Sequence, residues 1–225
     1  MVRLIRVFIT FLIGCTLFVG IPLLAWGPAD VSGFAADPAR RGYVALVLIL
    51  NAVAAYRIPE VGKAAMLPTT TVRRQHLAVV LLGALCVGIV MVAPYCDRRR
   101  LALIGGPTVR YVGLAMYLAG FLAMHVAEAH LGRLFSVEVS LQPGHALVTD
   151  GPYRFIRHPR YLGILVFSAG IALAFRSALG LALAAATLLV LLWRIRDEEA
   201  LMRREFGPAW EVYRRRSWRL VPLIF

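Results

Sequence analysis

The sequence predicts an all-α polytopic membrane protein with about six transmembrane helices, and its composition and the spacing of its apolar runs carry that prediction. Of its 225 residues, 60% are hydrophobic and only 16% are charged. The mean hydropathy of +0.74 is too apolar for a domain whose surface faces water. Several apolar runs approach the roughly 20 residues that cross a bilayer. Lipid is therefore the expected solvent for most of the chain.

Four of the expected spans precede residue 132, at 4–26, 43–56, 77–95 and 109–131. The first follows Arg3 and Arg6, as the apolar part of a signal peptide would. No small-residue cleavage site follows it, so we expect this run to remain as a helix. The run Arg98–Arg100 conflicts with simple alternation of the spans, because three arginines would then lie on the outer side.

The apolar run 161–193 is too long for one span, since a single helix of that length would extend about 50 Å. Arg176, Ser177 and Gly180 interrupt it and predict an antiparallel helical hairpin. The charged tail from Arg194 would then return to the cytoplasmic side, where we expect both termini. This organisation divides the chain into 1–131, with about four spans and a predicted role in substrate access, and 132–225, with a cofactor-binding loop, the hairpin and a C-terminal interfacial helix.

The net charge of +13 is carried almost wholly by arginine, because Lys63 is the one lysine in the sequence. The arginines gather at the ends of apolar runs, where they bind lipid phosphates and set the orientation of the helices. The expected partner of this charge is therefore the membrane bilayer and not nucleic acid. The sequence does not predict an oligomeric state.

Polar residues crowd the expected start of the fifth helix, in the loop that begins at His145. Pro159 suits the first position of a helix and pushes His158 out of the helical region, which makes His158 a cap residue. Arg154, Arg157 and Arg160 would then surround the positive end of the helix dipole. Cations are unfavourable there unless an anion is present, so the pattern predicts a bound anion. A lipid phosphate and a carboxylate or phosphate of a cofactor both fit.

An acidic run follows the hairpin at residues 197–199. Arg194 and Glu198 are four residues apart and therefore share one face of the helix that leaves the membrane. The acidic side chains could bind a ligand or only pair with nearby arginines.

The last part of the tail has the pattern of a second helix. Gly207 and Pro208 are expected to end one helix and begin another. Phe206, Trp210 and Tyr213 recur at helical spacing, which predicts an interfacial helix that lies flat among lipid headgroups.

Together the loop and the tail resemble the isoprenylcysteine carboxyl methyltransferase family and its phospholipid methyltransferase relatives. The shared pattern is His-x-Leu-Val, Gly-x-Tyr, Arg-His-Pro-x-Tyr-x-Gly and, after a helical hairpin, an acidic pair followed by Phe-Gly and spaced aromatic residues. The matching residues are His145, Leu147, Val148, Gly151, Tyr153, Arg157, His158, Pro159, Tyr161, Gly163, Glu198, Glu199, Phe206, Gly207, Trp210 and Tyr213. The order of these pieces is specific, although each piece alone is weak.

The resemblance implies an integral membrane methyltransferase that uses S-adenosyl-L-methionine and acts on a lipid-like or prenylated acceptor. It assigns cofactor binding to His145, Ala146, Leu147, Val148, Tyr153, His158, Pro159, Arg160, Tyr161 and Glu198. Arg194 occupies the place of the family's acceptor-binding arginine, so it is the candidate substrate-binding residue. Arg194 and Arg157 are the candidate catalytic residues, and no metal is expected.

The identity of the methyl acceptor decides which further groups the chemistry needs. A carboxylate acceptor needs no general base, and an arginine would hold it by a bidentate contact. An amine acceptor would have to lose a proton. His125 and Glu128, three residues apart on the fourth span, are the candidates to remove it.

Two other functions compete with methyl transfer. An NADPH-dependent membrane reductase of the sterol-reductase type would carry a similar Arg-His-Pro-x-Tyr sequence, and its cofactor phosphate would also suit the helix start at His158. A non-catalytic membrane module would use the arginines only to bind anionic lipid.

Overall fold

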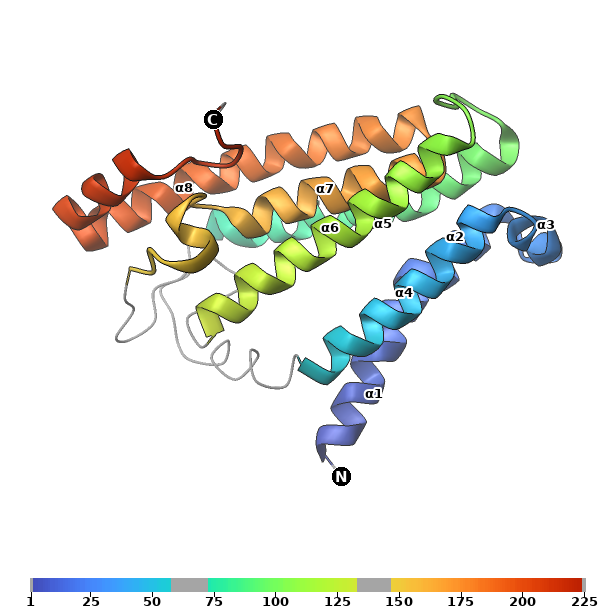
Figure 1. The fold of residues 1–225 in the computed structure, drawn as a ribbon, viewed down its shortest axis with the longest axis horizontal. Coiled ribbons are helices and arrows are strands. Elements are labelled where there is room, and N and C mark those ends of the chain that lie inside the picture. The colour runs from blue at the N-terminus through green and yellow to red at the C-terminus, as the bar shows by residue number, and fades with distance from the viewer. Residues whose placement is uncertain (1, 58–72, 133–146, 224–225) are drawn as a thin grey trace.

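Helices make up nearly all the secondary structure of the computed structural model, which describes residues 2–57, 73–132 and 147–223. The helical elements are α1 (Val2–Cys15), the π-helical turn η1 (Thr16–Gly20), α2 (Ile21–Trp26), η2 (Pro28–Asp30), α3 (Val31–Ala35), α4 (Pro38–Arg57), α5 (Arg73–Arg99), α6 (Thr108–Leu131), η6 (Gly151–Arg154), α7 (Pro159–Ala174) and α8 (Ala178–Arg216). Helices α5 to α8 lie side by side, and α1 and α4 pack against each other beside this group (Figure 1).

Five helical segments of the described part are long and apolar enough to cross a membrane. They are Arg3–Trp26, Pro38–Tyr56, Gln75–Arg99, Thr108–Leu131 and Ala178–Arg216. The remaining expected span, the fifth along the chain, corresponds to α7, whose 16 residues fall short of the roughly 20 that a full crossing takes. The all-α polytopic membrane fold is confirmed, while this crossing stays a prediction.

The helical hairpin expected from the sequence is formed by α7 and α8. The chain turns at Phe175–Ser177, where Arg176 adopts a left-handed conformation with φ of 53°. The Ser177 hydroxyl then caps α8 by accepting a hydrogen bond from the Gly180 N–H at 2.9 Å. Gly180 therefore lies inside the first turn of α8 and not in the connection.

Helix α8 is 39 residues long, so its charged second half extends beyond the apolar part that follows Ala178. Gly207, with φ of 47° and ψ of −119°, breaks its helical geometry at the expected position. After Arg216 the chain folds back on the start of α7, where the Arg157 N–H donates to the Trp218 carbonyl at 2.8 Å and the Trp218 N–H donates to the Phe155 carbonyl at 2.8 Å. The tail and the segment before α7 are thus joined by backbone hydrogen bonds.

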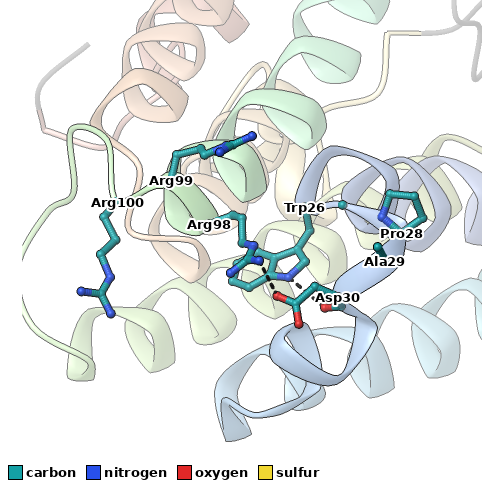
Figure 2. Close-up of a pocket in the computed structure, with 8 residues that line it drawn as sticks. Trp26, Pro28, Ala29, Asp30, Arg98, Arg99 and Arg100 are labelled. Atoms are coloured by element: carbon teal, nitrogen blue, oxygen red, sulfur yellow. Dashed lines mark hydrogen bonds and ion pairs between the residues drawn. The ribbon is translucent and has the colours of Figure 1, made fainter.

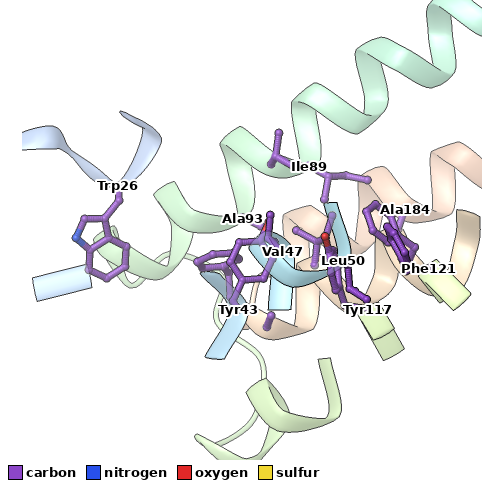
Figure 3. Packing of buried hydrophobic residues seen from close by; sticks show 14 of the residues in the cluster. Trp26, Tyr43, Val47, Leu50, Ile89, Ala93, Tyr117, Phe121 and Ala184 are labelled. Atoms are coloured by element: carbon purple, nitrogen blue, oxygen red, sulfur yellow. The ribbon is translucent and has the colours of Figure 1, made fainter. Parts of the chain in front are cut away.

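An aromatic cluster fills the space between α4, α6 and the hairpin (Figure 3). The Tyr43 ring packs edge-on against Phe175 at 5.1 Å and against Tyr117 at 5.6 Å between ring centroids. Tyr117 in turn lies 4.6 Å from Phe167. These offset and edge-on contacts fix α4 to the α6–α7 pair.

Helices α6 and α7 approach each other at backbone distance. Added Cβ atoms would lie 2.2 Å from the Ala174 nitrogen at Gly113 and 2.3 Å from the Phe167 nitrogen at Gly120. On α7, the same atom at Gly170 would lie 2.4 Å from the Tyr117 nitrogen. Small residues that allow such contact are a main source of helix association in lipid. Helix α6 consequently packs more extensively on α7 than on α4, although the predicted division of the chain falls between α6 and α7.

Of the three arginines that conflicted with simple alternation, Arg98 and Arg99 end α5 and Arg100 follows it, at the end of the molecule away from η6 (Figure 1). Carboxylates of the same end offset part of their charge. Arg98 forms an ion pair with Asp30 at 2.9 Å. The buried Asp97 accepts hydrogen bonds from Arg40 at 3.1 Å and from Arg110 at 2.7 and 2.8 Å.

The glycine contact predicts a position-specific loss of stability. Gly120→Ala should destabilise the purified protein by about 1–3 kcal/mol, because its methyl group overlaps the α7 backbone. Gly83→Ala is the matched control, since nothing lies within 4 Å of a Cβ at that position of α5. The control should keep or slightly raise the midpoint of thermal unfolding, because alanine is the better helix former. Equal midpoints for the two variants in detergent would contradict the packing described here.

Candidate functional site

The candidate site forms where α7 begins. His158 is the N-cap residue, with φ of −125° and ψ of 57°, and Pro159 occupies the first helical position, as expected. Both residues are buried. The preceding loop and the returning tail flank this helix end. The local sequence therefore sets the helix start, and the tail closes around it.

A tyrosine hydroxyl links the two charged residues that share one face of α8. The Arg194 Nε–H donates to the Tyr161 hydroxyl oxygen at 2.7 Å, and this hydroxyl donates to Glu198 Oε2 at 2.7 Å. The His158 ring stacks parallel to Tyr161 at 5.4 Å, and its Nδ1 lies 3.7 Å from Glu198 Oε2. Arg194 is 3% exposed, whereas 27% of the Glu198 side chain is exposed. A buried guanidinium and a more open carboxylate thus lie on opposite sides of one phenol.

A carboxylate of the chain itself lies among the arginines at the start of α7. Glu199 accepts a hydrogen bond from Arg157 Nε at 3.0 Å and two from Arg219, at 3.1 and 2.8 Å. The Arg157 Nη1–H also donates to the Arg214 carbonyl at 3.0 Å and to the Ser217 carbonyl. The donors of Arg157 therefore face Glu199 and the tail.

The 3-10 turn η6 is clamped between α6 and the tail. The Tyr153 hydroxyl donates to the Ala127 carbonyl at 3.3 Å, and the Tyr213 hydroxyl donates to the Tyr153 carbonyl at 2.7 Å. Beside them, His130 Nε2 forms a hydrogen bond with Asp150 at 3.0 Å, which lowers the pKa of that exposed carboxyl below its usual value. The loop thus reaches α7 along a defined path.

Most of the residues predicted to bind the cofactor gather around the start of α7. Besides the residues already placed, Arg160 lies there and donates from Nε to Glu128 at 2.7 Å. Leu147 and Val148 are partly buried and lead into η6. His145 and Ala146 lie outside the described residues.

The aromatic face of the last helical segment differs from the expectation. Trp210 is 3% exposed and Tyr213 is 8% exposed, and their rings contact each other at 5.6 Å. These two rings are therefore covered by protein and are not free to contact lipid headgroups, while an interfacial position of the helix stays a prediction. The sequence gives the helical spacing of the aromatic residues but not the surface that covers them.

The two candidates for removing a proton from an amine acceptor are occupied by local contacts. His125 Nδ1 forms a hydrogen bond with the Phe121 carbonyl at 2.9 Å, and Glu128 pairs with Arg160. In the described part of the chain, no group of three His, Cys, Asp or Glu side chains could hold a metal ion.

Two polar contacts near the site were missed by the sequence analysis. One is the pairing of Glu199 with Arg219. The only sequence feature that pointed to this pair was the excess of arginine in the tail. The other joins α5 to α8, where the fully buried Gln75 donates from Nε2 to Asp197 at 2.8 Å. The only sequence feature that pointed to this contact was a glutamine at the start of an apolar run.

The comparisons with known proteins agree with the resemblance. Residues 112–204 match the model of the isoprenylcysteine carboxyl methyltransferase (ICMT) family. A probable protein-S-isoprenylcysteine O-methyltransferase of Oryza sativa subsp. indica is 31% identical over 123 residues, which cover 52% of this chain and 62% of the relative. The protein-S-isoprenylcysteine O-methyltransferase of Schizosaccharomyces pombe is 35% identical over 105 residues, which cover 44% of this chain and 43% of the relative. The chain thus spans less than two thirds of the length of either relative.

The fold of the whole described chain is also similar to a solved structure. The eukaryotic intramembrane Ras methyltransferase ICMT aligns with a TM-score of 0.51 at 18% sequence identity, covering 99% of this chain and 75% of that one. The N-terminal helices, which carried no recognised motif, are therefore included in the similarity of fold. The sequence matches favour the methyltransferase interpretation over the reductase alternative.

The Glu199 cluster predicts how the tail is held. Glu199→Gln should leave Arg157 and Arg219 without their shared carboxylate, at a cost of up to about 3 kcal/mol for this mostly buried group. Cleavage by trypsin at Arg214–Arg216 should then be about tenfold faster, because local opening of the tail limits it.

Glu211→Gln is the matched control for this prediction. Glu211 also pairs with two arginines, Arg203 at 2.8 Å and Arg214 at 3.1 Å, but all three side chains are more exposed than Glu199. Its loss should change the cleavage rate by less than about twofold. If both variants were cleaved at the rate of the unmodified protein, Glu199 would not hold the tail.

Proposed function

Because residues 112–204 match the model of the ICMT family, we propose that the chain belongs to this family and is an integral membrane methyltransferase. It would use S-adenosyl-L-methionine to methylate a lipid-like or prenylated acceptor that reaches the site from the bilayer. The observation that carries the proposal is the link from Arg194 through the Tyr161 hydroxyl to Glu198. It gives an anion-binding group and a cation-binding group on either side of one tyrosine.

The chemistry of the donor set fits the cofactor. When bound, S-adenosyl-L-methionine supplies an electrophilic methyl group on a sulfonium. The partly exposed Glu198 would accept hydrogen bonds from its ammonium or ribose hydroxyls. The buried His158 ring lies between two carboxylates, with Nδ1 3.7 Å from Glu198 Oε2 and Nε2 3.5 Å from Glu199 Oε1, and it would position Glu198 beside the ligand. Tyr153, Pro159, Arg160 and the 145–148 segment complete the proposed binding residues.

Arg194 would hold the acceptor. A guanidinium matches the two oxygens of a carboxylate, and its burial strengthens that contact. The hydrogen bond to Tyr161 fixes the plane of the guanidinium and hence the direction in which one carboxylate oxygen points. This oxygen would take the methyl group that the bound cofactor supplies on its sulfonium, and no proton would have to move. For this acceptor the site needs no general base.

Tyr161 would act as a spacer. Arginine and glutamate four residues apart on a helix commonly pair directly, which would neutralise both. Here the phenol accepts from one and donates to the other. Arg157, whose donors face Glu199 and the tail, would take part by positioning the start of α7.

The orientation of the protein in the membrane is part of the same proposal. The helices place the start of α1 and the tail at the end of the molecule that carries the site (Figure 1). That end holds the arginine-rich segment after Trp193. The positive-inside rule therefore favours a cytoplasmic site with both termini on the same side.

Cofactor binding tests the role of Glu198. The purified protein should bind S-adenosyl-L-methionine and be stabilised by it, whereas NADPH should have no effect. Glu198→Gln should weaken binding about tenfold or more, because one charge-assisted hydrogen bond contributes on the order of 1.5–3 kcal/mol. Glu205→Gln, an exposed change on the same helix, should leave the affinity unchanged in calorimetry. Equal affinity in both variants would remove Glu198 from the site.

Turnover tests the role of Arg194 separately. With a soluble S-prenylated cysteine as acceptor, Arg194→Lys should reduce methyl transfer by about 100-fold, since lysine cannot make the bidentate contact. Cofactor affinity should remain within about threefold, because Glu198 is untouched. The methyl ester of the same acceptor should not react. Transfer to an amine lipid such as phosphatidylethanolamine, with none to the prenylated cysteine, would overturn the carboxylate assignment.

A further inference from the structure

Two adjoining cavities lie at the end of the molecule opposite the candidate site. They measure about 530 and 490 Å³ and share Trp26, Arg98 and Arg100 as walls. The basic residues that line them are Arg40, Arg98, Arg99, Arg100, Arg110 and Arg176. The acidic lining residues are Asp30 and Asp97. The lining of these cavities is thus strongly basic.

The inner arginines form a fixed wall. Arg110 is 5% exposed and binds both oxygens of Asp97 and the Ala174 carbonyl, the last at 3.0 Å, and its Nε forms an ion pair with Asp37 at 3.0 Å. Arg40, 8% exposed, donates to Asp97 and to the Phe34 and Gly33 carbonyls at 2.7 and 2.9 Å. Both oxygens of the Asp97 carboxylate are bound by these two arginines, which neutralise its charge. It therefore offers little charge to the outer arginines.

The outer arginines are left with one carboxylate among the lining residues. Arg98 pairs with Asp30 and lies over the Trp26 ring at 5.5 Å (Figure 2). The Arg99 guanidinium lies over the Tyr95 ring at 5.8 Å and forms no hydrogen bond or ion pair with the described residues. The Arg100 guanidinium forms no hydrogen bond or ion pair within the described ranges, and it stands apart from Asp30 in Figure 2. The outer part of the cavities therefore keeps uncompensated positive charge.

Two of the lining arginines lie at strained positions of the backbone. Arg100, Ala102 and Arg176 have positive φ values of 56°, 46° and 53°. Such conformations cost residues with a Cβ about 1–2 kcal/mol each and tend to persist where function requires them. Here the two loops are tied together, since the Ile104 N–H donates to the Arg176 carbonyl at 2.8 Å. Arg100 and Arg176 therefore both line the second cavity, and the Arg176 guanidinium also donates to the Ile104 and Gly105 carbonyls.

We propose that these cavities bind a phosphate group on the membrane face opposite the methyl-transfer site. The phosphate would belong to the headgroup of an anionic lipid or be a free anion. Arginine is suited to phosphate oxygens through its planar fork of donors, and Trp26 is the kind of residue that lies at headgroup level. Filling the site would join the α5–α6 loop and the α7–α8 turn to the segment at Trp26. The site is separate from cofactor binding and does not depend on methyl transfer.

Thermal unfolding of the purified protein in neutral detergent, without cofactor, tests this proposal. Phosphatidylglycerol in mixed micelles should raise the unfolding midpoint by about 4 °C, and zwitterionic phosphatidylcholine should not. The unfolding midpoint in sodium phosphate, compared with that in sodium chloride at equal ionic strength, distinguishes a free phosphate anion from a lipid headgroup. A shift equal to that of the lipid identifies a free anion, and no shift identifies the headgroup.

Two single variants decide whether the cavity is responsible. Arg100→Gln should abolish at least half of the stabilisation. Arg41→Gln should retain it, because Arg41 is an exposed arginine near the same end, bound to the Ala35 carbonyl and outside the cavity lining. Equal loss in both variants would mean that only the general charge of this face attracts lipid. Absence of stabilisation by every probe would likewise overturn the proposal.

Discussion

The backbone contact between α6 and α7 is the constraint on which the candidate site depends. In lipid, burying apolar side chains gives little preference for one helix partner over another, so close packing has to set the register. Gly120 on α6 and Gly163 on α7 leave no room for the helices to slide, since a Cβ at Gly163 would lie 2.7 Å from Met124. This register brings Arg160 to Glu128 and Tyr153 to Ala127. The start of α7 is therefore fixed in depth.

The neighbouring acids Glu198 and Glu199 make different contacts at this helix end. Successive residues of a helix point about 100° apart, so one faces Tyr161 and the other faces the tail. The buried Glu199 cluster has a desolvation cost that an apolar contact would avoid. What it provides is a specific attachment of the tail at Arg157 and Arg219. The tail then encloses the site, while Glu198 stays more open.

The sequence predicted those features that local rules determine. Apolar runs located the helices, Pro159 located the start of α7, and four-residue spacing placed Arg194 and Glu198 on one face, as their shared contact with Tyr161 shows. It did not predict contacts between distant segments, such as that of Arg98 with Asp30. Periodicity identifies the face that Trp210 and Tyr213 share, but only packing decides whether lipid or protein covers it. The N-terminal helices carried no motif at all.

The arginines at the two ends of the molecule differ in what compensates them. At the site end, Arg157, Arg160 and Arg219 each donate a hydrogen bond from Nε to a carboxylate. Arg194 is different, because its Nε–H is bound by the neutral phenol of Tyr161. Because Arg194 is 3% exposed, its electrostatic attraction for an incoming anion is stronger than it would be in water. This burial, together with the plane that Tyr161 fixes for the guanidinium, is the physical basis of the proposal that Arg194 holds the acceptor and that the other site arginines belong to the framework around it.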